Sequence, residues 1–289
     1  MTVPPPPPPP PPPQHPQRPH RRTARRAVTA AAATVLVLAP ATGAGAEART
    51  PGPRAPRAFV TLASVDPTIR QDIRYAGPRN FVGDPIDGYR EPVCILTRPA
   101  ADALRRAQAA LLRQGHALKV YDCYRPQRAV DHFVRWAEDP DDQRHKAEFY
   151  PRVDKSRLFE DGYIARRSGH SRGSTVDVTL VRLPDLPAPP PRPGPEPGAC
   201  DAPRAERYPD GSVDMGTGFD CFDTLSHTDD PRVGEAQREN RRRLRTALAA
   251  EGFVNLPEEW WHFTYRPEPF PDSHFDFPVA RRSVAGHRP

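Results

Sequence analysis

The chain has 289 residues, enough for one or two average domains, with 41 prolines and a net charge of +6. Five arginines and one glutamate in residues 1–48 account for +4 of this charge, which leaves +2 for the rest of the chain. Arginines in that remainder are interleaved with acidic residues, a pattern typical of a solvated surface, so the charge argues against a nucleic-acid-binding protein.

The first 48 residues are predicted to be a proline-rich leader ending in a secretory signal. The proline run Pro4–Pro13 cannot nucleate a core. A basic stretch, the apolar run Ala27–Ala39 and small residues suited to cleavage near 46–48 follow in the order of a signal peptide. The apolar run is short for a bilayer span, so we expect export and no stable membrane span after cleavage. An uncleaved anchor is the alternative, and the export route stays open.

After a Pro/Arg linker at 49–57, we expect one globular domain at 58–280 and a tail at 281–289. Apolar spacing and proline position predict helices, whereas alternating or β-branched runs predict strands. In chain order the predicted elements are short extended segments at 59–65 and 72–76, a helix at 99–113, a strand at 117–121, a helix at 126–136, a strand at 174–180, a helix at 233–251 capped by Gly252, and a last strand at 260–265.

Strands and helices are mixed in this order without a regular βαβ alternation, which predicts a single α+β domain. The proline-rich segment 184–203 can be neither a central strand nor a helix interior, so we expect an exposed loop there.

Four cysteines follow the leader, and an even number in an exported chain favours disulfides. Three pairings are possible. Nearness in sequence favours Cys94 with Cys123 and Cys200 with Cys221. No C-x-x-C motif is present, which argues against a cysteine zinc site.

A first motif runs from Ser168 to Asp177 and places His170 seven residues before the aspartate. Gly169 and Gly173 favour a tight turn that enters a strand rather than a helix. Imidazole nitrogen and carboxylate oxygen both bind Zn²⁺, so a metal site is one interpretation. In the alternative, the histidine caps a loop and the aspartate makes a structural hydrogen bond.

A second motif, residues 258–262, places Glu259 three residues before His262 and beside two tryptophans. Residues i and i+3 of a regular strand face opposite ways, so Glu259 should lie on an irregular approach to the strand, after Pro257. With the first motif this gives three ligands and a general base, the arrangement of a catalytic zinc site. The alternative is a set of core aromatic residues. The helical H-E-x-x-H signature is absent.

A third motif, residues 121–126, places Arg125 at the end of a predicted strand. A fixed guanidinium there could stabilise the oxyanion formed when a peptide carbonyl is attacked. An ordinary structural ion pair is the alternative.

In this order, the three motifs resemble the VanX-type D-alanyl-D-alanine dipeptidases of the zinc D-Ala-D-Ala peptidase superfamily. The resemblance extends from about residue 59 to residue 278. It implies a hedgehog-like α+β domain with a central, mostly antiparallel sheet flanked by helices. Six further segments carry it: Arg74–Ala76, Asn80–Gly83, Asp87–Tyr89, Met215–Asp220, Asn240–Arg245 and Phe275–Pro278.

The resemblance implies one Zn²⁺ per chain, held by His170, Asp177 and His262. It makes Glu259 the general base and then the acid, and Arg125 the group that stabilises the oxyanion.

The same resemblance assigns the substrate contacts. Asp220 and Tyr75 would bind the free amino group of the dipeptide, Ser168 would lie near its C-terminal end, and Tyr89 would line the pocket. Two features depart from the family: the proline-rich insertion near Asp220, which could cover the mouth of the site, and the leader.

The implied function is hydrolysis of the dipeptide D-alanyl-D-alanine to two D-alanines in peptidoglycan metabolism. The leader suggests action on wall-turnover products outside the membrane. One alternative is a zinc D,D-carboxypeptidase that trims peptidoglycan stem peptides. Another is a zinc-binding module without catalysis. The sequence leaves the oligomeric state open.

Overall fold

The computed structural model describes residues 54–184 and 197–284, which belong to one compact unit, Arg49–Pro289. The predicted leader, most of the linker, residues 185–196 of the proline-rich loop and residues 285–289 of the tail lie outside the described residues. Within the described ranges, no helix combines the length and apolar character needed to cross a membrane.

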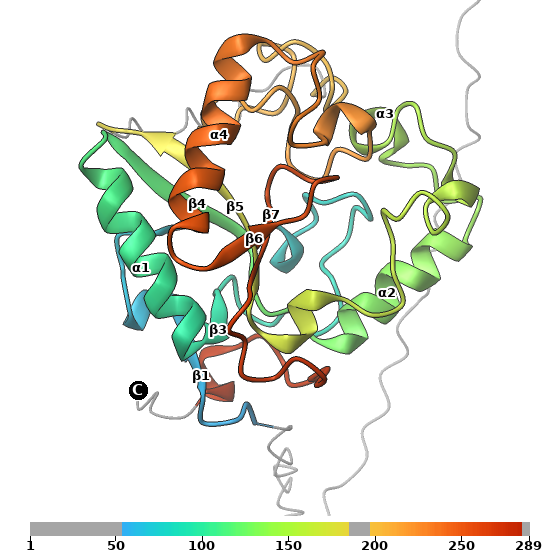
Figure 1. The fold of residues 1–289 in the computed structure, drawn as a ribbon. Helices are drawn as coiled ribbons and strands as arrows, with labels where there is room; N and C mark the ends of the chain where they lie inside the picture. The colour runs from blue at the N-terminus through green and yellow to red at the C-terminus, as the bar shows by residue number, and fades with distance from the viewer. Residues whose placement is uncertain (1–53, 185–196, 285–289) are drawn as a thin grey trace, which may run out of the picture. The chain divides into compact units, whose positions relative to one another are not determined.

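A five-stranded sheet forms the centre of the domain (Figure 1). The outer pair β2–β4 is parallel and the other three pairs are antiparallel, which confirms the mostly antiparallel sheet expected from the sequence. A separate antiparallel pair joins β1 (Phe59–Thr61) to β3 (Ile95–Thr97). In spatial order the central strands are β2 (Arg70–Gln71), β4 (His116–Asp122), β5 (Thr175–Arg182), β7 (His262–Tyr265) and β6 (Phe253–Asn255).

Two long helices, α1 (Arg98–Leu112) and α4 (Glu235–Ala249), pack against each other and against the sheet (Figure 1). The shorter α2 (Gln127–Glu138) lies away from this pair. Helix α1 follows the pattern expected of it, with proline in its first turn and a buried alanine–leucine face. The remaining short helices are α3 (Lys146–Phe149) and the 3₁₀ turns Leu62–Ser64, Arg74–Ala76, Lys155–Arg157, Gly169–Arg172, Thr224–Ser226 and Arg281–Ser283.

Helices α1, α2 and α4 and the strands β4 and β5 lie where the sequence predicted them. The extended segment expected at 72–76 is wrong: residues 74–76 form a 3₁₀ turn, and the strand lies earlier, at Arg70–Gln71. The last strand begins at His262 rather than residue 260, because turns precede it. Strands β3 and β6 were not predicted, since three residues are too few to show an alternating pattern.

Two disulfides are present, Cys94–Cys123 and Cys200–Cys221, the pairing that sequence nearness favoured. The first joins the segment before β3 to the residue directly after β4. The second lies beside Asp220. Each closes a loop, of 29 and 21 residues in sequence separation.

Replacing both Cys94 and Cys123 with serine should lower the free energy of unfolding by about 3 kcal/mol, because the unfolded chain regains the entropy of an open loop. Denaturant unfolding of the variant and of the wild type checks this. Wild-type protein unfolded under reducing conditions is the control and should lose more, because both disulfides open. A loss below about 1 kcal/mol in the variant would contradict the expectation.

Candidate active site

Three neighbouring strands bring polar side chains together on one face of the sheet. In the antiparallel ladder, Asp122 of β4 lies opposite Asp177 of β5, which in turn lies opposite His262 of β7. Directly opposed residues of antiparallel strands project from the same face. A β-bulge after Val120 leaves Tyr121 out of the pairing, as often occurs beside functional sites. The strand register therefore places Asp177 and His262 side by side.

His170 reaches this pair from the 3₁₀ turn that precedes β5. The side chain of Ser168 caps the turn by accepting a hydrogen bond from the His170 backbone N–H at 3.2 Å. The turn ends at Gly173, where φ is +82° and a Cβ would lie 2.1 Å from the Phe59 ring, so only glycine fits. The turn predicted from the glycines is therefore present, as one turn of 3₁₀ helix.

A backbone carbonyl sets the orientation of the His170 ring. The ring nitrogen Nδ1 lies 2.7 Å from the carbonyl oxygen of Cys123, and a carbonyl can only accept a hydrogen bond. Nδ1 therefore carries the proton, and Nε2 presents its lone pair to the cluster. A backbone or carboxylate partner of this kind is typical of metal-binding histidines.

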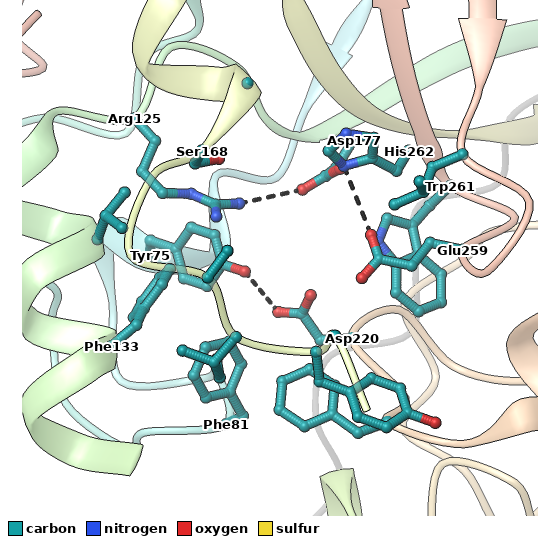
Figure 2. Close-up of a pocket in the computed structure, with 18 of the residues that line it drawn as sticks. Tyr75, Phe81, Arg125, Phe133, Ser168, Asp177, Asp220, Glu259, Trp261 and His262 are labelled. Carbon is teal, nitrogen blue, oxygen red and sulfur yellow. Dashed lines mark hydrogen bonds and ion pairs between the residues drawn. The ribbon is translucent and has the colours of Figure 1, made fainter. Parts of the chain in front are cut away.

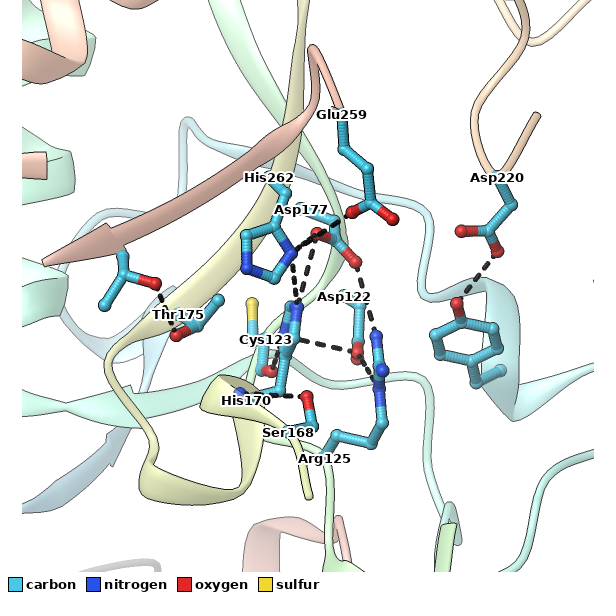
Figure 3. A network of polar contacts seen from close by, with 12 residues as sticks. Asp122, Cys123, Arg125, Ser168, His170, Thr175, Asp177, Asp220, Glu259 and His262 are labelled. Atoms are coloured by element: carbon cyan, nitrogen blue, oxygen red, sulfur yellow. Dashed lines mark hydrogen bonds and ion pairs between the residues drawn. The ribbon is translucent and has the colours of Figure 1, made fainter. Parts of the chain in front are cut away.

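The three predicted metal ligands meet at distances that suit a metal ion (Figure 3). His170 Nε2 lies 3.3 Å from Asp177 Oδ1 and 3.3 Å from His262 Nδ1, and these last two atoms are 3.2 Å apart. Ligands about 2.0–2.1 Å from a tetrahedral zinc would be separated by about 3.3–3.4 Å. Asp177 Oδ1 is buried, and although both ring nitrogens lie near it, no group in residues 54–184 and 197–284 donates a well-directed hydrogen bond to it. The donor set and this oxygen both fit a bound cation.

Glu259 lies in the turn before β7, on the irregular approach that the sequence required. Its carboxylate is 3.4 Å from His262 Nδ1 and 16% exposed. Burial raises the pKa of Glu259 to about 7, although the neighbouring His262 lowers it. A carboxyl group with such a pKa can both accept and release a proton near neutral pH.

Arg125 follows β4 and takes part in a buried network (Figure 3). Its Nε donates to Asp122 Oδ2 at 2.9 Å, and an Nη atom lies 3.5 Å from Asp177 Oδ2. The structural ion pair considered for Arg125 is thus present, and it also holds the guanidinium at the pocket wall. The sequence did not single out Asp122, although it lies in the same motif.

Tyr89 was expected to line the pocket, but it lies behind Arg125 instead. Its hydroxyl donates to Asp122 Oδ1 at 2.5 Å, and it is absent from the described residues that line the pocket. Tyr89 therefore supports the site through the carboxylate that holds Arg125 and through an edge-on contact with the Tyr75 ring, whose centroid lies 5.8 Å from its own.

Asp220 faces the cluster from the opposite side of the pocket. Its Oδ2 accepts a hydrogen bond from the Tyr75 hydroxyl at 2.8 Å, and its backbone adopts a left-handed conformation with φ of +57°. Burial, followed by the charge of Asp177, raises the pKa of Asp220 well above its usual range. No cation forms an ion pair with Asp220 among the residues that the structure describes, so an ammonium group would be a favourable partner.

Asp220 and Tyr75 line one pocket of about 210 Å³ with Arg125, Asp177, Glu259 and His262 (Figure 2). Ser168 lies beyond Arg125, away from Asp220, in both close-up views. Sequence reasoning missed Arg167, an exposed cation at the pocket wall that no described carboxylate pairs with. The sequence signal that could have identified Arg167 is its position directly before Ser168, which was expected near the C-terminal end of the substrate. The pocket residues labelled in Figure 2 are Tyr75, Phe81, Arg125, Phe133, Ser168, Asp177, Asp220, Glu259, Trp261 and His262.

Three clustered metal-type ligands, a carboxyl group and a fixed guanidinium around one small pocket define a candidate metallohydrolase site. The family model described as D-ala-D-ala dipeptidase, Peptidase_M15, matches residues 56–187 and 209–280. The chain belongs to this peptidase family, which confirms the expected resemblance. The match omits residues 188–208, which contain most of the proline-rich insertion.

Relatives agree with this assignment. A D-alanyl-D-alanine dipeptidase of Streptomyces coelicolor is 43% identical over 212 residues, which cover 73% of this chain and 93% of that protein. One from Enterococcus faecalis is 38% identical over 77% of this chain and 98% of its own length. Another from Escherichia coli K12 is 30% identical over 71% of this chain and 83% of its own length.

Proposed function

We propose that this protein is a zinc-dependent dipeptidase that hydrolyses D-alanyl-D-alanine to two D-alanines. The observation that carries the proposal is the buried Asp220 carboxylate, which lies across the pocket from Glu259 and forms no ion pair with any cation of the described ranges. A free amino group beside the scissile bond would supply that partner, whereas an acylated amine would leave the carboxylate unpaired.

The ligand set supports zinc as the metal. His170, Asp177 and His262 would supply two nitrogens and one oxygen, a donor set that zinc favours in hydrolases, with a further position left for substrate or water. When bound there, zinc acts as a Lewis acid on the oxygen atoms of water and of a peptide carbonyl.

The chain's own residues would transfer the protons and stabilise the negative charge that develops on the carbonyl oxygen. Glu259 accepts a proton from the attacking water and then delivers it to the leaving amine as the C–N bond breaks. Arg125, held by Asp122, faces the negative charge that develops on the carbonyl oxygen. Its orientation is fixed before the substrate arrives, so little reorganisation is needed.

The two ends of the pocket have opposite charge, which would orient a zwitterionic dipeptide. The ammonium end would meet Asp220 and the hydroxyl of Tyr75, and the carboxylate end would lie toward Ser168 and Arg167. The small volume supports a dipeptide-sized substrate, since drug-sized ligands occupy about 300–1,000 Å³. Glu259 and Arg125 at the pocket wall argue against a binding module without catalysis.

Comparing two substrates tests this function. The purified, zinc-loaded protein should release D-alanine rapidly from D-alanyl-D-alanine and much more slowly from an N-acylated tripeptide that ends in D-alanyl-D-alanine. Preference for the longer peptide would instead indicate a D,D-carboxypeptidase, and the role given to Asp220 would be wrong.

Replacing Asp220 with asparagine should raise the KM for the dipeptide about 10–100-fold, because the ammonium loses its charged partner while the tyrosine hydrogen bond can persist. Steady-state kinetics measure this, and cleavage of the N-acylated peptide should change little. Tyr75→Phe, which leaves the carboxylate in place, should have a smaller effect. An unchanged dipeptide KM in Asp220→Asn would contradict the anchoring role.

We also propose that the protein is exported and acts on peptidoglycan-turnover products outside the membrane. The order of basic, apolar and small residues in the leader supports this. Fusion of residues 1–48 to a reporter enzyme tests it. Retention of the reporter in the cytoplasm would contradict export.

A further inference from the structure

Asp220 lies at the top of an irregular loop, residues Met215–Thr228, which we call the Asp220 arch. Apart from the 3₁₀ turn Thr224–Ser226, the arch contains no regular secondary structure. The segments before and after Asp220 are called here the first and second legs of the arch. They are joined directly by a hydrogen bond of 3.0 Å between the hydroxyls of Thr217 and Ser226. No sheet ladder fixes the arch, so other contacts set the position of Asp220, among them the Cys200–Cys221 disulfide beside it.

One arginine of helix α4 bridges both legs of this arch. Arg241 Nε donates to the carbonyl oxygen of Met215 at 2.7 Å, in the first leg. Its two Nη atoms donate to the carbonyls of His227 at 2.5 Å and Leu225 at 3.0 Å, in the second leg. A guanidinium is planar and rigid, so these three bonds constrain the spacing of the legs, together with the bond between Thr217 and Ser226.

The adjacent residue extends the same contact. Asn240 Nδ2 donates to the carbonyl of Asp214 at 2.8 Å, directly before the arch. Asn240 and Arg241 belong to the segment Asn240–Arg245, which the sequence marked as part of the family resemblance without giving it a role.

The burial of Arg241 is unfavourable by itself. Its side chain is 2% exposed, and no carboxylate within the described ranges forms an ion pair with it. Burial lowers the pKa of Arg241 to about 10, so the group remains charged at neutral pH. An apolar side chain would avoid this desolvation cost but would leave the carbonyls of Met215, Leu225 and His227 without this donor. The guanidinium therefore serves to satisfy and space these three carbonyls.

We propose that Asn240 and Arg241 are positioning residues that hold the Asp220 arch and thereby set the affinity for the substrate's free amino group. This inference rests on the proposed dipeptidase function. The left-handed backbone of Asp220, at φ of +57°, is held between the two bridged legs. A change in leg spacing would move the carboxylate away from the ammonium, and even small displacements of a binding group lower catalytic efficiency.

The test uses the full-length, zinc-loaded protein and the variants Arg241→Met, Arg241→Lys and Asn240→Ala. Arg242→Met is the matched control, because Arg242 lies on the same helix but pairs with surface glutamates. The measurements are kcat and KM for D-alanyl-D-alanine, kcat/KM for its N-acetyl derivative, and bound zinc per chain.

In Arg241→Met we expect the dipeptide KM to rise at least about 10-fold, with kcat within about 3-fold, zinc content unchanged and selectivity over the N-acetyl derivative reduced. Arg241→Lys should rescue part of the loss, and Arg242→Met should match the wild type. Asn240→Ala, which removes only the bond to Asp214, should raise KM in the same direction.

A folded Arg241→Met protein with wild-type KM and selectivity would overturn the proposal, as would loss of zinc with a fall in kcat. If Arg241→Met fails to fold, Asn240→Ala decides, and a wild-type KM there overturns it. Failure of the proposed function looks different, because the wild-type protein would then not cleave the dipeptide.

Discussion

Glu259→Gln should lower kcat for the dipeptide by at least about 10³-fold while the protein stays folded and keeps its zinc. Glutamine preserves the shape of the side chain but can no longer take a proton from the attacking water. The neutral amide also lacks the negative charge that the Glu259 carboxylate carries beside His262 when it is deprotonated. Steady-state kinetics and elemental analysis of bound zinc measure the two properties separately.

The neighbouring glutamate supplies the control for this variant. Glu258 is exposed and does not line the pocket, so Glu258→Gln should retain wild-type kinetics. A Glu259→Gln protein with more than about a tenth of wild-type kcat would show that another group moves the proton.

Removing the metal should lower activity about as strongly as Glu259→Gln does. A chelator should abolish activity and added zinc should restore it, because the proposed site would hold the metal through three side chains of the described part of the chain. His170→Ala should lower zinc affinity by at least about 10²-fold and activity accordingly, since its imidazole supplies one of the three ligand atoms. Zinc titration and kinetics of the variant check this.

A histidine outside the cluster gives the comparison for the metal-site variant. His132 contacts the surface residue Asp87 and lies away from the described metal ligands, so His132→Ala should bind zinc normally. Activity that survives complete zinc removal would contradict the metal-dependent function.

The candidate metal site could be predicted from sequence because its signals are local. His170 and Asp177 flank a glycine turn, and Glu259 precedes His262 by a spacing that excludes a regular strand. Their convergence, in contrast, depends on the β4–β5–β7 register, which pairs residues far apart in sequence. Short local patterns do not encode that register, so motif order and family resemblance had to supply it.

The supporting network was beyond sequence reasoning for the same reason. Asp122 lies three residues before Arg125, yet only the structure shows its bonds to both Arg125 and Tyr89. Tyr89 was given a place in the pocket because it belongs to a segment shared with the family. A shared segment does not distinguish a side chain that touches substrate from one that holds its neighbour in place.

Because Asp177 and His262 are paired across β5 and β7, zinc binding at the proposed site would depend on correct pairing of these two strands. Side chains alternate along a strand, so a slip of β7 by one residue would turn His262 toward the opposite face and separate it from Asp177. A misregistered protein could keep its helices and most of its core and still lack the ligand set. Zinc stoichiometry in a purified preparation should therefore measure the fraction of molecules whose central sheet has formed in the correct register.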